Sequence, residues 1–96
     1  MRVMIKASLD TDQSNEVFRS GKMPELMGEI LDRIQPEAAY FGPHGGCRTC
    51  FLVCDMQDSS ELPPKLEPLF DRLGADVEVF PVMNRDDLQK GISQLR

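Results

Sequence analysis

Apolar and polar residues alternate along four segments of the chain and recur every three or four residues along two others. Alternation is the pattern of a strand with two different faces, and the longer period is that of an amphipathic helix. Strands are therefore predicted at Arg2–Ser8, Ala38–Phe41, Arg48–Met56 and Asp76–Val82. One helical segment follows the first strand and one follows the third, which is the order of elements in a split βαβ arrangement.

Each of the two main helical segments carries one apolar stripe. The first begins at Met23 and ends before Pro36, and the second ends at Gly74. Pro68 lies inside the second, where a proline removes a hydrogen bond and costs about 3 kcal/mol, so we expect a kink or a late helix start. The two stripes comprise Met23, Leu26, Met27, Ile30, Leu31 and Ile34, and Leu62, Leu66, Leu69, Phe70 and Leu73.

The remaining segments are expected to connect these elements. We predict a polar connector at Asp10–Ser14, a short helical turn at Asn15–Arg19 and a hairpin loop at Gly42–Gly46. Asn84 followed by Asp87 is a partial capping box, which predicts a short helix over Arg85–Gln94.

These elements predict a single ferredoxin-like α+β domain over residues 1–96, a βαββαβ sandwich with a four-stranded antiparallel sheet and a short C-terminal helix. Helices would cover one face of the sheet and leave the other bare. A chain of this length buries only about two-thirds of its unfolded surface, so a second copy on the bare face would be a natural supplement. We therefore expect a homodimer.

Charge and hydropathy exclude two classes of partner. The net charge is −5, and the eleven Lys and Arg residues are scattered among sixteen acidic ones, which argues against nucleic acid. No apolar run approaches the roughly 20 residues that cross a bilayer, and the first residues do not resemble a signal peptide. We expect a cytoplasmic protein whose three cysteines are reduced.

His44, Cys47 and Cys50 form the densest cluster of reactive residues. Their spacing of three could hold zinc, but Cys54, the fourth soft ligand, would lie about 13 Å from Cys50 along a strand. Cys47 and Cys50 also have the spacing of a redox pair. They leave a turn and enter a strand, however, where residues three apart face opposite sides and no helix lowers the thiol pKa. Buried thiols are the favoured interpretation, and we predict no metal and no cofactor.

The bare face of the sheet is the second candidate site. If Val3, Ile5, Phe51, Val53, Val77 and Val79 face the helices, this face gathers Lys6, Tyr40, Arg48, Cys50 and Glu78 beside Met4, Leu52 and Phe80. An apolar floor with a few polar groups is typical of a small-molecule pocket. Lys6 and Arg48 could hold a carboxylate or enolate, Glu78 could accept a proton, and Tyr40 or His44 could donate one. The same residues could instead form an ordinary dimer interface in which Glu78 pairs with a basic side chain.

Several stretches resemble a family of small uncharacterised bacterial proteins. They are Pro36-Glu-Ala-Ala-Tyr-Phe, Ser60-Glu-Leu-Pro, Leu66-Glu-Pro-Leu-Phe, Ala75-Asp-Val-Glu-Val-Phe-Pro-Val-Met and Asp86-Asp-Leu. The resemblance implies a dimeric α/β barrel, in which two ferredoxin-like sheets pack face to face around a cavity. That superfamily includes muconolactone isomerases, cofactor-free monooxygenases that act on quinol-like substrates, and ligand-sensing modules. Gly46-Cys47-Arg48 replaces the aromatic-rich third-strand motif of the isomerases, so their chemistry is not carried over to this chain.

Three functions follow as hypotheses. The first is a homodimeric module that binds a small polar or anionic metabolite between its sheets, favoured because no nucleophile–base pair or cofactor motif is visible. The second is a cofactor-independent isomerase or monooxygenase for a small cyclic or aromatic substrate, which would use Lys6, Arg48, Glu78 and His44. The third is a metal or thiol-redox site at the His44–Cys50 cluster.

Overall fold

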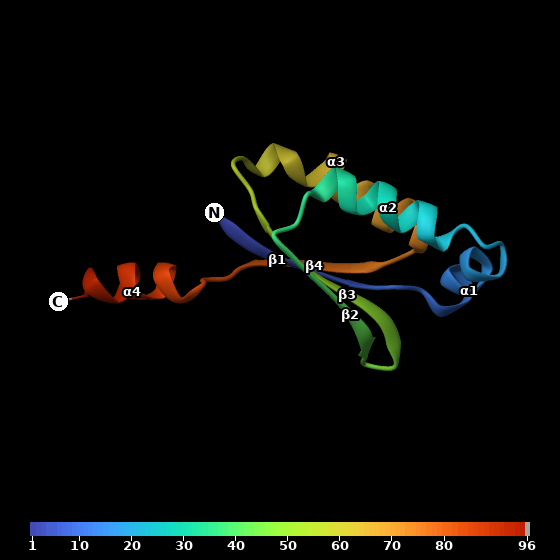
Figure 1. Cartoon of the computed structure of the whole chain (residues 1–96), viewed down its shortest axis with the longest axis horizontal. Helices are drawn as coiled ribbons and strands as arrows, with labels where there is room; N and C mark the ends of the chain where they lie inside the picture. Colours follow the sequence, from blue (N-terminus) through green and yellow to red (C-terminus); the bar gives the residue numbers. More distant parts are fainter. Residues whose placement is uncertain (96) are drawn as a thin grey trace.

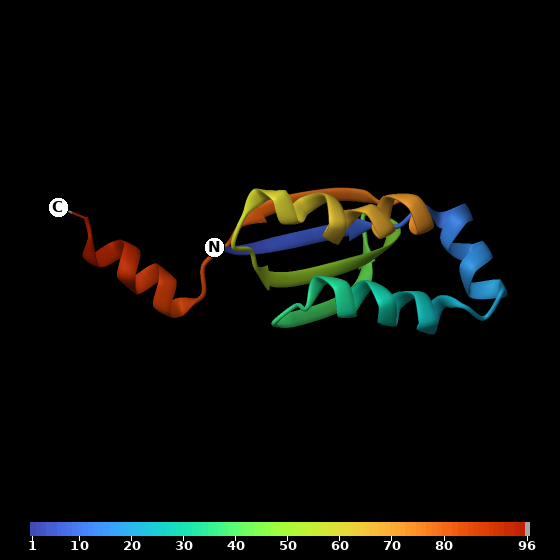
Figure 2. The same cartoon turned by 90° about the horizontal axis from the view of Figure 1, so that it is seen from above.

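One antiparallel sheet with helices on one of its faces forms the body of the protein (Figures 1 and 2). The computed structural model describes residues 1–95. The strands β1 (Arg2–Ser8), β2 (Ala38–His44), β3 (Cys47–Asp55) and β4 (Asp76–Pro81) lie in the order β2-β3-β1-β4. The helices are α1 (Thr11–Arg19), α2 (Met23–Ile34), α3 (Leu62–Leu73) and α4 (Arg85–Ser93), with a short 3₁₀ helix, η1 (Ser59–Glu61), before α3. The predicted ferredoxin-like α+β fold is confirmed.

The core lies between the sheet and helices α2 and α3. Ile5 of β1 pairs directly with Leu52 of β3, and both side chains are fully buried, as are Leu69 and Leu73 of α3. Residues that pair directly share a face of the sheet, so Leu52 points toward the helices with Ile5. Burying a side chain of this size contributes roughly 1.5–3 kcal/mol, which holds the helices on this face.

The predicted facing of β3 is therefore wrong. Phe51 pairs with Lys6 of β1 and points away from the helices, and Val53 pairs with Met4 on the same side. Both faces of β3 carry apolar residues, so alternation separates the two faces without identifying the covered one. Only pairing with β1, whose faces differ clearly in polarity, assigns Cys50, Leu52 and Cys54 to the core.

Helix α1 begins earlier than the sequence pattern indicates. The segment predicted as a polar connector, Asp10–Ser14, contains its N-cap and first turn, because the Asp10 side chain accepts a hydrogen bond from the Gln13 amide at 2.9 Å. Ser14 is fully buried in this helix, and its hydroxyl donates to the Thr11 carbonyl at 3.2 Å. The helix has few apolar residues, so periodicity alone detected only its last part.

Helix α3 starts at Leu62 and continues through Pro68, so it does not start late. Pro68 has no N–H to donate to the carbonyl of Pro64, one turn earlier. The Arg33 guanidinium of α2 donates to that carbonyl at 3.2 Å. A neighbouring helix thus supplies the hydrogen bond that the proline removes.

The β2–β3 hairpin has a shorter loop than the predicted Gly42–Gly46. Strand β2 extends to His44 and β3 begins at Cys47, which leaves Gly45 and Gly46 as the connection. Their φ angles are +61° and +80°, as a two-residue hairpin turn with two left-handed positions requires.

Helix α4 projects away from the body at one end of the molecule, opposite the end where α1 lies (Figures 1 and 2). The molecule measures 55 × 27 × 17 Å as a result. The predicted capping box is confirmed, with Asn84 accepting from the Asp87 amide at 2.8 Å and Asp87 accepting from the Asn84 amide at 3.1 Å. Leu88 and Ile92, one turn apart on α4, are 46% and 54% exposed.

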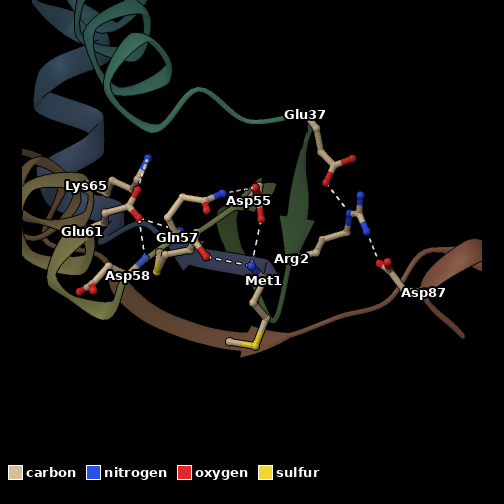
Figure 3. Close-up of polar contacts among 10 residues, drawn as sticks. Met1, Arg2, Glu37, Asp55, Gln57, Asp58, Glu61, Lys65 and Asp87 are labelled. Atoms are coloured by element: carbon tan, nitrogen blue, oxygen red, sulfur yellow. Dashed lines mark hydrogen bonds and ion pairs between the residues drawn. The ribbon is translucent and has the colours of Figure 1, made fainter. Parts of the chain in front are cut away.

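A polar cluster joins the base of α4 to the sheet (Figure 3). Arg2 of β1 donates to the carboxylates of both Glu37 and Asp87, and the N-terminal amine contacts the Asp55 carboxylate at 3.0 Å. The backbone N–H of Asn84 and the Arg2 guanidinium both donate to the Asp87 carboxylate, and they lower the pKa of this carboxyl group. Within residues 1–95, no helix has the length and apolar character needed to cross a membrane.

Candidate functional site

The face of the sheet opposite the helices, called the open face below, carries two rows of side chains that cross all four strands. Tyr40, Phe51, Lys6 and Glu78 pair in succession across β2, β3, β1 and β4, and Ala38, Val53, Met4 and Phe80 form the adjacent row. Lys6 and Glu78 are thus the charged groups in two rows that are otherwise apolar or aromatic. No element within residues 1–95 covers these rows (Figure 1).

Lys6 and Glu78 form an ion pair in which the Lys6 ammonium lies 3.6 Å from a Glu78 carboxylate oxygen. The Lys6 side chain is 24% exposed and that of Glu78 is 66% exposed. A pair this accessible to water stabilises a fold by about 0–1 kcal/mol at most. One carboxylate also leaves donors of the three-donor ammonium available for another anion.

Aromatic rings flank this ion pair. Tyr40 is 68% exposed and Phe80 is 42% exposed, while Phe51 is half-buried between Tyr40 and Lys6 in the same row. The His44 ring stands edge-on to the Phe51 ring at 5.7 Å between centroids and 86° between planes. The open face therefore offers flat apolar surfaces beside a cation, a carboxylate and a phenol.

Four of the six predicted ligand-binding residues belong to this face: Lys6, Tyr40, His44 and Glu78. Arg48 and Cys50 do not, because they alternate with Phe51 and lie on the helix side of β3. Phe51 and Val53, which the sequence pattern had assigned to the core, take their place on the open face. The signal that could have placed them was the pairing partner, since Lys6 opposite Phe51 cannot point into the core.

Arg48 lies instead beside α1. One guanidinium nitrogen donates to the hydroxyl of the buried Ser14 at 2.7 Å, and the guanidinium carbon lies 4.7 Å from the centre of the Phe18 ring. These two contacts hold the side chain at one end of the helix layer, on the side of the sheet away from Lys6.

The His44–Cys50 cluster does not converge on one point. His44 pairs with Cys47 across the hairpin, but Cys50 lies on the opposite face of β3 and is 3% exposed. In the part of the chain that the structure describes, no three His, Cys, Asp or Glu side chains are grouped as metal ligands would be. Burial raises the pKa of the Cys50 thiol to about 11 and also raises that of Cys54.

Thiol labelling should distinguish the half-buried Cys47 from the buried Cys50 and Cys54. With iodoacetamide at pH 8, we expect Cys47 to react first and Cys50 and Cys54 to stay unmodified while the protein is folded. The half-buried Cys47 is accessible, whereas burial keeps the other two protonated and shielded, and only the thiolate reacts. Mass spectrometry of peptides from native and urea-unfolded samples measures the order. Early labelling of Cys50 in the native sample would contradict its placement in the core.

A comparison with protein-family models and with curated proteins finds no match to this chain.

Proposed function

We propose that this chain is a homodimeric binding protein whose two open faces pack against each other and enclose a small polar or anionic metabolite beside Lys6. The observation that carries this proposal is the Lys6–Glu78 ion pair, set in two otherwise apolar rows on a face that no element within residues 1–95 covers. The arrangement would be that of the dimeric α/β barrels.

Three features favour a second copy of the chain as the cover. Exposed apolar patches of more than a few hundred Å² are rare on monomers, and the open face carries Tyr40, Phe51 and Phe80 together with Val53 and Met4. Lys6 and Glu78 lie in one row, so under two-fold symmetry the lysine of one protomer can meet the glutamate of the other. The face is thus complementary to itself in charge as well as in hydrophobicity.

Helix α4 is the third feature. It has nine residues, and helices shorter than about 12–15 residues are marginal in water without tertiary packing. It stands clear of the sheet and of the other helices (Figures 1 and 2), and its Leu88 and Ile92 side chains are about half exposed. We infer that α4 packs against the other subunit, which would stabilise the helix and extend the interface.

The chemistry of the enclosed site favours a planar anion. The Lys6 ammonium supplies hydrogen-bond donors to a carboxylate, the Phe51 and Tyr40 rings provide flat apolar contacts, and the Tyr40 hydroxyl can donate or accept. The isomerase alternative would use the Lys6–Glu78 pair as acid and base, and it would be recognised by conversion of the bound compound.

Binding of 4-hydroxybenzoate, a polar aromatic anion, tests the proposal. We expect Lys6→Met to weaken its binding by about tenfold or more, because a hydrogen bond to a charged group contributes about 1.5–3 kcal/mol and each 1.4 kcal/mol is tenfold. Titration calorimetry measures the affinity, and native mass spectrometry gives the number of ligands for each dimer.

Lys22→Met is the matched control, since Lys22 is the exposed N-cap residue of α2, a helix on the other side of the sheet from the open face. It removes the same charge and should leave binding unchanged. Equal affinities for the two variants, or no binding of the probe to the parent dimer, would contradict the proposed site. A parent protein that stays monomeric at micromolar concentration would contradict the dimer.

A further inference from the structure

A cavity of about 310 Å³ lies on the helix side of the sheet, at the end of the molecule opposite α4. It is formed between the end of α1, the start of α2, and strands β2 and β3. Its apolar walls include Leu9, Phe18, Met23, Met27, Phe41 and Pro43. A volume of about 300 Å³ is the lower end of the range found for small-molecule sites.

The walls of this cavity are not those of an ordinary core. Phe18 lines it from α1 and Phe41 from β2, and the two side chains are 50% and 54% exposed. Met23 is buried and Met27 half-buried, whereas the two phenylalanine rings reach solvent. Two large rings left partly in water around a hollow indicate that the hollow is incomplete without an occupant.

Arg48 is the one charged residue among those that line the cavity. Its guanidinium is held by the Ser14 hydroxyl at 2.7 Å and by the Phe18 ring at 4.7 Å. Within residues 1–95 it has no carboxylate within salt-bridge distance, although the chain carries a net charge of −5. The bond to Ser14 uses one of five N–H donors, which leaves donors for a second acceptor.

We propose that this cavity binds a small monocarboxylate with an apolar body, whose carboxylate pairs with Arg48 and whose body lies among Met23, Met27 and Phe41. The guanidinium fork matches a carboxylate in geometry and charge, and it is already oriented by Ser14 and Phe18. The site is separate from the open face, because Arg48 and Lys6 point to opposite sides of the sheet.

The six methionines make the test direct, because they are distributed over several parts of the molecule. Met23 and Met27 line the cavity, Met4 lies on the open face, and Met83 lies before α4. The full chain, labelled with ¹³C at the methionine methyl groups, is titrated with hexanoate and, separately, with hexan-1-ol. We expect hexanoate to shift the Met23 and Met27 signals saturably and to leave those of Met4 and Met83 in place.

Hexan-1-ol has the same apolar chain without the charge, so we expect its affinity to be lower than that of hexanoate by about tenfold or more. Arg48→Met should weaken hexanoate binding by about tenfold or more, equal to about 1.4 kcal/mol, and should leave hexan-1-ol binding unchanged. Arg19→Met removes the same charge from an exposed position on α1 and should have no effect. Arg48→Lys keeps the charge but loses the planar fork, and it should give an intermediate affinity even if Arg48→Met does not fold.

Several results would overturn the proposal. Equal affinities for hexanoate and hexan-1-ol would show that the cavity has no anion site. An equal loss of hexanoate affinity in Arg48→Met and Arg19→Met would show the same. Shifts at Met4 without shifts at Met23 and Met27 would place the carboxylate on the open face. Lys6→Met separates this inference from the proposed function, because it should leave the Met23 and Met27 titration unchanged.

Discussion

Phe51→Asp is expected to produce a folded monomer. Phe51 lies between Tyr40 and Lys6 on the open face, where its ring is half-buried in a single chain and would be fully buried between two. In the proposed dimer the substitution removes an aromatic contact and adds a carboxylate from each subunit. We expect the dimer dissociation constant to rise at least about a hundredfold, equal to about 2.7 kcal/mol, which is the scale of a central interface aromatic.

Sedimentation equilibrium over a range of concentrations measures this change, and circular dichroism checks that the variant is folded. Phe70→Asp is the matched control, because Phe70 is 46% exposed on α3, in the helix layer on the other side of the sheet. It should leave the dissociation constant unchanged. An interface on the helix layer would reverse the order of the two variants and refute face-to-face packing of the sheets.

Leu52→Ala should cost about 2–5 kcal/mol of unfolding free energy, the second large effect. The Leu52 side chain is completely buried opposite Ile5, so its truncation leaves a cavity between the sheet and the helices. Domains of this size are stable by only about 5–15 kcal/mol, and the loss is a large fraction of that. Urea unfolding followed by circular dichroism gives the value.

Val53→Ala provides the comparison, since Val53 is the next residue and points to the open face. Both substitutions are best made in the Phe51→Asp background, so that dimer dissociation does not contribute to the measured free energy. We expect Val53→Ala to cost about 1 kcal/mol or less there, as for a partly exposed position. A larger loss for Val53→Ala than for Leu52→Ala would show that β3 faces the other way.

Local patterns in the sequence predicted most of the elements. The alternation of Arg2–Ser8 and the stripe from Met23 to Ile34 correspond to β1 and α2 with the same bounds. The capping box at Asn84 and Asp87 also formed where it was predicted. Each of these signals involves residues within a few positions of one another, whose physical effect does not depend on the rest of the chain.

Two features of the helices were not predicted from the sequence: the start of α1 and the position of Pro68 inside α3. Helix α1 has too few apolar residues for a clear period, and its start depends on the Asp10 side chain bonding the Gln13 amide. Pro68 can remain inside α3 because Arg33, from another helix, donates to the carbonyl that the proline leaves without a partner. The first contact joins residues three apart and was missed because the segment is polar, whereas the second joins two helices and lies outside any short window of residues.

The sequence by itself determined the order of the elements and the existence of an open sheet face bearing Lys6, Tyr40 and Glu78. Only the tertiary structure decided which residues of β3 join them, because Phe51 and Leu52 are both apolar and the choice rests on pairing with β1. The same pairing moved Arg48 to the other side of the sheet, beside Ser14 and Phe18. A shift of one residue exchanges the two faces of a strand, so this long-range register separates the two candidate binding sites.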